Sequence, residues 1–139
     1  MNKVTNTVKE WFANANEDLR VAQALWTLGP EKYLKTIPYH CQQTAEKSIK
    51  GYLAYKEIKF PKIHDIAILV NLMGPTASEL SQLLLKADDL TDYAVAFRYP
   101  DASRKNEATV KDSEEALELA KKVYIAMSAL IPFDSQWNL

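Results

Sequence analysis

The chain has 139 residues, of which 47% are hydrophobic and 25% charged, so its size and composition are those of one globular domain and exclude a disordered segment. The 3 glycines and 6 prolines are too few for the turns of a typical all-β fold, and the glycines lie too far apart for a phosphate-binding glycine loop. The formal net charge of −1 excludes an overall basic field that would attract nucleic acid.

The first predicted element is a long helix over residues 8–28. Its apolar side chains recur at helical spacing, at Trp11, Ala15, Leu19, Ala22 and Leu25. Thr7 and Glu10 match a capping box at its start, and Gly29-Pro30 ends it. The segment is therefore expected to pack one face against the rest of the domain.

A short helical turn over residues 31–35 and a second long helix over 38–56 are expected next. Pro38 begins the long helix, because proline fits a first helical turn but not a helix interior. Glycine costs a helix interior about 1 kcal/mol relative to alanine, so Gly51 predicts a compensating tight contact with another helix. Cys41 lies on the apolar stripe of this helix and is expected to be an inert core thiol.

Three further helices complete the pattern. One covers residues 65–72, and the next covers 76–97, with a capping box that begins at Thr76. Pro100 closes that helix, and the last one covers 110–130. Because all the long segments are amphipathic and their loops are short, the sequence predicts an all-α fold, an antiparallel up-and-down bundle of four to five helices.

No linker or repeat divides the chain, so we expect a single domain over residues 1–139 with a core from about 8 to 131. With one cysteine and two histidines that show no metal-ligand spacing, neither a disulfide, a metal site nor another cofactor is expected. No signal-like segment and no apolar run of roughly 20 residues is present, which favours a cytoplasmic protein with no membrane partner.

Charge is unevenly distributed along the chain. Residues 32–62 hold seven lysines against two glutamates, whereas residues 65–139 hold twelve acidic against seven basic side chains. The basic and acidic parts can face each other within the fold or between subunits, or they can lie scattered over a solvated surface.

The densest polar pattern is YHCQQTAEKSIK, residues 39–50, on the second long helix. Four of its side chains fall along one stripe: His40, Gln43, Lys47 and Lys50. Histidine, glutamine and lysine on one face can bind an anionic, hydrogen-bonding ligand such as a phosphate or a base. The same stripe can instead be a solvated helix face with one Glu46–Lys50 salt bridge, or a dimer interface.

Two shorter polar clusters lie downstream. Arg98 can clamp a phosphate and Tyr99 can stack on a base; alternatively the segment only ends a helix, with an Arg98–Asp101 contact. His64 can be a ligand or a general acid or base, or it can pack at the helix junction. Asp65 can cap the free backbone N–H groups of the helix that follows.

Segment 39–50 resembles the central-helix signature of the HEPN (higher eukaryotes and prokaryotes nucleotide-binding) domain family. Four other segments are similar to that family in the same order: 11–22, 60–66, 93–101 and 116–123. The resemblance covers about residues 8–131. It implies a four- or five-helix bundle that forms a homodimer and that, in prokaryotes, is often encoded beside or fused to a minimal nucleotidyltransferase.

Many members of that family are metal-independent ribonucleases that act as toxins or defence effectors, with an arginine followed after four to six residues by a histidine. Arg98 matches the arginine, but no histidine follows it anywhere in the chain. The sequence therefore resembles the non-catalytic, nucleotide-binding branch of the family.

Three functional hypotheses follow from these residues. The first is a non-catalytic dimeric module, part of a toxin–antitoxin-like pair, that binds a nucleotide or phosphate ligand through Arg98, Lys47, Lys50, Tyr39, Tyr99, His40 and Gln43. The second is a metal-independent ribonuclease that uses Arg98 with His40 or His64. The third is a purely structural interaction subunit.

Overall fold

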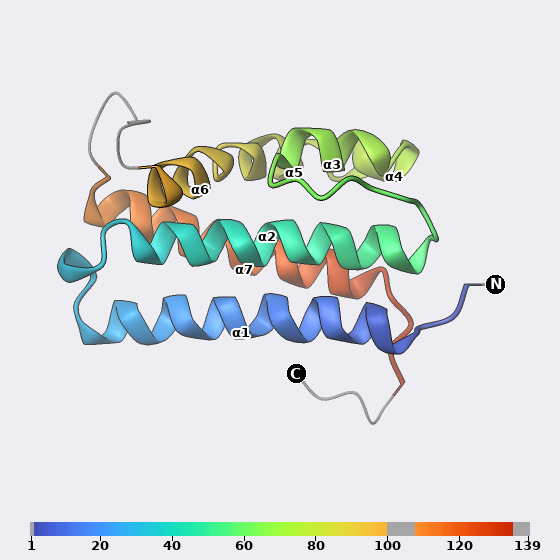
Figure 1. Ribbon diagram of the computed structural model, residues 1–139, viewed down its shortest axis with the longest axis horizontal. Coiled ribbons are helices and arrows are strands. Elements are labelled where there is room, and N and C mark those ends of the chain that lie inside the picture. Colours follow the sequence, from blue (N-terminus) through green and yellow to red (C-terminus); the bar gives the residue numbers. More distant parts are fainter. Residues whose placement is uncertain (1, 100–107, 135–139) are drawn as a thin grey trace.

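The computed structural model describes residues 2–99 and 108–134, and every regular element in these ranges is helical (Figure 1). The elements are α1 (Asn6–Leu28), the 3-10 turn η1 (Pro30–Lys32), α2 (Thr36–Tyr55), α3 (Ile66–Leu72), α4 (Pro75–Glu79), α5 (Ser81–Asp88), α6 (Thr91–Arg98) and α7 (Val110–Ala129). None of the helices in the described part combines the length and the apolar content needed to cross a membrane.

The helices form the predicted antiparallel bundle. Figure 1 shows α1 and α2 running in opposite directions, the short helices α3 to α6 returning along one edge, and α7 running back behind α2. α2 packs against α1, α3, α6 and α7 and is therefore the central helix of the domain. This position explains why even polar residues of α2 are buried.

α1 and α2 each begin two residues, about half a helical turn, before the predicted start, whereas α1 ends at Leu28 as predicted. α1 begins at Asn6, and its N-cap is Thr5, whose hydroxyl accepts a hydrogen bond from the Val8 N–H at 3.2 Å. The predicted capping box at Thr7 is therefore wrong. α2 begins at Thr36, and Pro38 lies in its first turn, as proline chemistry allows.

The predicted continuous helix over residues 76–97 is also wrong, because the structure has three short helices, α4, α5 and α6, in that region. The breaks bring Asp88 and Thr91 to the start of α3. The Asp88 carboxylate accepts a hydrogen bond from the Ala67 N–H at 3.1 Å. The Thr91 hydroxyl accepts one from the Ile66 N–H at 3.2 Å. The first N–H groups of a helix have no partner within that helix, and here side chains from another segment supply one. Helical periodicity in the sequence gives no sign of such a contact.

The predicted tight contact at Gly51 is confirmed. A Cβ atom at this position would lie 2.6 Å from Cε2 of Phe12, a fully buried side chain of α1. Thr76 does not cap a helix as predicted, because its hydroxyl instead lies 2.8 Å from the Tyr52 hydroxyl. Both contacts hold the C-terminal half of α2 close to its neighbours.

Candidate functional site

The polar residues of segment 39–50 are mostly buried rather than solvated. Its buried polar side chains are Gln42, Gln43, Thr44, Glu46, Ser48 and Lys50. A solvated helix face is therefore the wrong interpretation of this pattern. Because buried polar groups are costly unless paired, each of these side chains needs a partner inside the fold.

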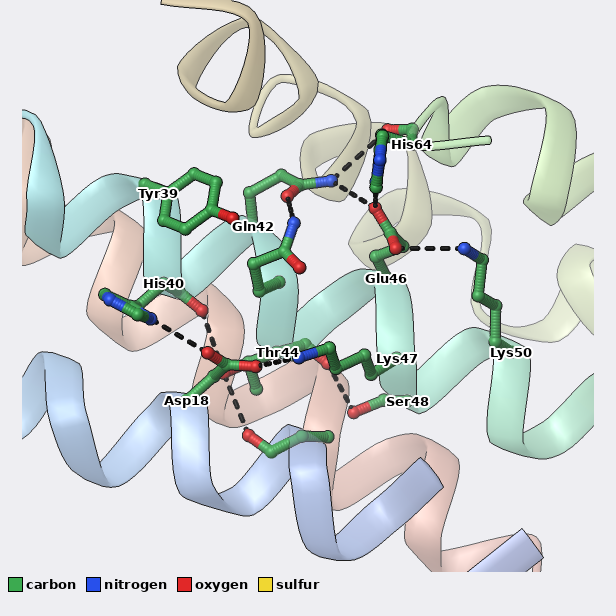
Figure 2. Close-up of polar contacts among 12 residues, drawn as sticks. Asp18, Tyr39, His40, Gln42, Thr44, Glu46, Lys47, Ser48, Lys50 and His64 are labelled. Atoms are coloured by element: carbon green, nitrogen blue, oxygen red, sulfur yellow. Dashed lines mark hydrogen bonds and ion pairs between the residues drawn. The ribbon is translucent and has the colours of Figure 1, made fainter. Parts of the chain in front are cut away.

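Asp18 of α1 organises the first polar cluster (Figure 2). One carboxylate oxygen lies 2.8 Å from Nδ1 of His40, and the other accepts a hydrogen bond from Nζ of Lys47 at 2.6 Å. The side chains of His40 and Lys47 are about a quarter exposed, at 23% and 25%. The first cluster therefore joins α1 to α2 and still reaches the surface.

Glu46 organises a second cluster that is buried more deeply, with a side-chain exposure of 3%. Its carboxylate contacts Nζ of Lys50 at 3.0 Å, Nδ1 of His64 at 2.8 Å and Nε2 of Gln42 at 3.0 Å. Gln43 in turn donates to the side-chain oxygen of Gln42 at 2.6 Å. Gln43 is thus part of an internal network rather than of an open face.

Lys50 is enclosed by its neighbours. Its ammonium group donates to the Ile63 carbonyl at 2.8 Å and lies 5.7 Å from the ring of Trp11 and 5.9 Å from that of Phe60. An ammonium group over an aromatic face gains further electrostatic stabilisation. Lys50 therefore acts within the fold, where it ties α2 to the segment that precedes α3.

Tyr39 brings together two groups that lie far apart in the sequence. Arg98, at the end of α6, donates a hydrogen bond from Nη2 to the Tyr39 hydroxyl at 3.2 Å, and its guanidinium lies 5.2 Å from the ring centre. Phe97 stacks on the same ring at 4.0 Å, and the His40 ring meets it edge-on at 5.2 Å. Tyr99, the next residue after Arg98, is 60% exposed.

The other predicted residues fall in different places. Asp65 caps α3 by accepting a hydrogen bond from the Ile68 N–H at 3.3 Å, which confirms a structural role. Asp101 lies outside the described residues. Cys41 is fully buried as predicted, and burial, with a smaller contribution from the Asp18 charge, raises the pKa of its thiol.

Across residues 2–99 and 108–134, no cluster of three or more His, Cys, Asp or Glu side chains could hold a metal ion.

The contact of Asp18 with His40 and Lys47 is the main feature that sequence reasoning missed. A weak signal was present in the sequence. Asp18 adjoins Leu19, which lies on the buried face of α1, and α1 packs closely against α2. An acidic side chain beside such a face needs a polar or cationic partner on the neighbouring helix.

The model of the HEPN domain matches residues 8–130. The chain belongs to the HEPN domain family. This HEPN chain is similar in structure to TT1696 from Thermus thermophilus, with 27% sequence identity and a TM-score of 0.72 over 91% of this chain and 100% of that one.

A second solved structure similar to this HEPN chain is ST0689, described as an archaeal HEPN homologue. Its sequence identity is 24% and its TM-score 0.68, over 88% of this chain and 96% of that one. At this identity the likeness shows a shared fold only. No curated protein matches the chain.

Proposed function

We propose that this HEPN domain is a non-catalytic module that binds a nucleotide or another phosphorylated ligand and acts as a dimer. The observation that carries the proposal is the meeting of Arg98 with Tyr39, next to His40. A guanidinium is the side chain best suited to hold a phosphate through two hydrogen bonds. Exposed aromatic rings beside it offer stacking surfaces for a base.

The proposed site is smaller than the stripe predicted from the sequence. It comprises Arg98, Tyr39, Tyr99, His40 and Lys47, all of which are at least partly exposed. Gln43 and Lys50 are left out, because both are buried and hydrogen-bonded inside the domain. In the proposed site Arg98 holds the phosphate and Tyr99 stacks on the base.

A nucleotide that binds at this site is expected to raise the thermal midpoint of the protein. At a concentration one hundred times its Kd, a ligand adds about 2.7 kcal/mol to the free energy of unfolding. For a domain of this size, that gain raises the thermal midpoint by several degrees. The measurement is a thermal shift with a panel of mono-, di- and trinucleotides. Arg98→Ala should remove the shift, and added salt should weaken it.

Arg20→Ala is the matched control for this experiment, because Arg20 is an exposed arginine of α1 outside the proposed site. It should leave the nucleotide shift unchanged. A shift that survives in Arg98→Ala, or no shift with any nucleotide, would count against the proposed site.

A second candidate is a metal-independent ribonuclease that uses Arg98 with His40. It is favoured over a pairing with His64 because Tyr39 contacts both Arg98 and His40, whereas His64 lies against Glu46. Asp18 holds Nδ1 of His40 and leaves Nε2 to act as general acid or base. Arg98 would stabilise the charge that develops on the phosphate.

Under the ribonuclease hypothesis, RNA is cleaved in the presence of a chelator, and His40→Ala lowers the rate at least about 100-fold, in line with the usual contribution of general acid–base catalysis. His64→Ala is the comparison variant and should retain activity. Gel analysis of labelled RNA at high protein concentration measures the cleavage rate of each variant. Intact RNA under these conditions would exclude the ribonuclease and leave the binding module.

We further propose that the dimer pairs with a minimal nucleotidyltransferase in a toxin–antitoxin-like system. Sedimentation measures the mass of the protein in solution and therefore tests the dimer directly. A stable dimer that responds to no nucleotide would instead favour the third hypothesis, a purely structural interaction subunit.

A further inference from the structure

A groove of about 960 Å³ lies between α5 and α7, away from Tyr39 and Arg98. One wall runs from Glu79 to Tyr93 and the other from Asp112 to Lys122. None of the residues that line the groove belongs to the proposed nucleotide site. The groove is therefore an independent feature of the molecule.

The floor of the groove is apolar. Leu80 and Leu83 of the α4–α5 segment line it together with Ala116 and Leu119 of α7. Leu80, Leu83 and Leu119 are only partly buried, so the floor still exposes apolar surface to solvent. Covering that surface would be favourable by the hydrophobic effect.

The rim of the groove is acidic. Its carboxylates are Glu79, Asp89, Asp112, Glu115 and Glu118. Among the described residues that line the groove, Lys86 and Lys122 oppose these five, which leaves a formal excess of three negative charges. A rim of this sign repels nucleic acid and favours a cationic partner.

The helical walls of the groove favour a helix over an extended strand as its occupant. One wall is α7, and the other is made of α5 with the end of α4 and the start of α6, so neither wall is a strand edge that could pair with an added strand. A helix satisfies its own backbone and can lay an apolar face on the floor. The wall from Asp112 to Lys122 spans about 15 Å, which is about three helical turns.

We propose that the groove between α5 and α7 is a docking site for a basic amphipathic helix of a partner protein. Apolar side chains at positions i, i+3, i+4 and i+7 of that helix lie on Leu80, Leu83 and Leu119. Lysine or arginine side chains at the edges of the helix meet the carboxylates of the rim. The inference does not depend on nucleotide binding at Arg98.

The test uses a fluorescently labelled synthetic peptide of about 16 residues, with leucines at these helical positions and lysines on both flanks. Fluorescence anisotropy measures its affinity for the whole protein. The double variant Glu115→Lys with Glu118→Lys should bind the peptide at least tenfold more weakly. The matched control, Glu10→Lys with Glu17→Lys, changes the net charge equally at exposed positions of α1 and should bind normally.

A peptide of the same composition in scrambled order tests whether the helical apolar face matters, and it should bind at least tenfold more weakly. Three results would overturn the proposal. They are no binding of the ordered peptide, equal binding of the scrambled peptide, and equal loss of affinity in both double variants. Self-association that disappears in the Glu115/Glu118 double variant would assign the groove to a second copy of this chain and would also overturn it.

Discussion

Glu46→Gln is expected to lower the free energy of unfolding by about 3–5 kcal/mol, because it leaves the buried ammonium of Lys50 without its counter-charge. Both side chains are at most 7% exposed, so water cannot replace the lost partner. His64 and Gln42 lose an anionic acceptor at the same time. The effect is measured by urea unfolding, which reports the free energy directly for a small two-state domain.

The chain contains a matched control for the Glu46 prediction. Glu118 and Lys122 form a pair with the same four-residue spacing at 3.2 Å, but their side chains are 68% and 62% exposed. Glu118→Gln should therefore cost less than about 0.5 kcal/mol. Equal costs for the two variants would show that burial does not govern the Glu46–Lys50 pair.

A double variant separates the pair from its surroundings. Glu46→Met with Lys50→Met removes both charges and keeps most of the volume. Since replacing a buried ion pair with apolar side chains is often neutral or stabilising, the double variant should be more stable than Glu46→Gln alone. A double variant that is less stable than Glu46→Gln would show that the hydrogen bonds to Ile63 and His64 matter more than the charges.

The second large effect is expected at Phe12 of α1, which contacts α2 at Gly51 and α7 at Tyr124. Phe12 is fully buried, and its ring packs edge-on against Tyr124 and Phe133, with ring centres 6.3 and 5.3 Å away. Phe12→Ala should lower the free energy of unfolding by about 3–5 kcal/mol, because it removes these contacts and leaves a cavity. Phe97→Ala, at a ring that is 40% exposed, should cost much less.

Gly51 makes the Phe12 prediction sharper, because the effect of Gly51→Ala should change sign with residue 12. In the natural chain the new Cβ atom would lie 2.6 Å from Phe12. Overpacking of this kind costs about 1–3 kcal/mol, which outweighs the gain of about 1 kcal/mol in helix propensity. In the Phe12→Ala background the clash is gone, and Gly51→Ala should stabilise.

Urea unfolding of the two single variants and the double variant completes this cycle. A coupling of at least about 1 kcal/mol between positions 12 and 51 is expected, because residues in direct contact do not act additively. Additive effects, or a stabilising Gly51→Ala in the natural chain, would contradict the contact.

Part of the candidate site could be predicted from the sequence because its chemistry is local. Arg98 and Tyr99 share a helix end, and His40 and Lys47 share a helix face, so each group was visible in its own segment. Arg98 and Tyr39 are 59 residues apart in the sequence, and the spacing of residues along the chain does not show that their side chains are in contact. Asp18 was missed for the same reason, since its partners lie on another helix.

The sequence by itself determined the all-α class, the positions of the three long helices, the buried Cys41 and the close contact at Gly51. Each of these follows from hydrophobic periodicity or from the conformational preference of one residue type. Only the tertiary structure decided that residues 76–97 form three helices and that Gln43 and Lys50 face inward. The reason is physical: helical spacing places side chains on a face, but the neighbouring helices decide whether that face meets solvent, and α2 has neighbours on almost every side.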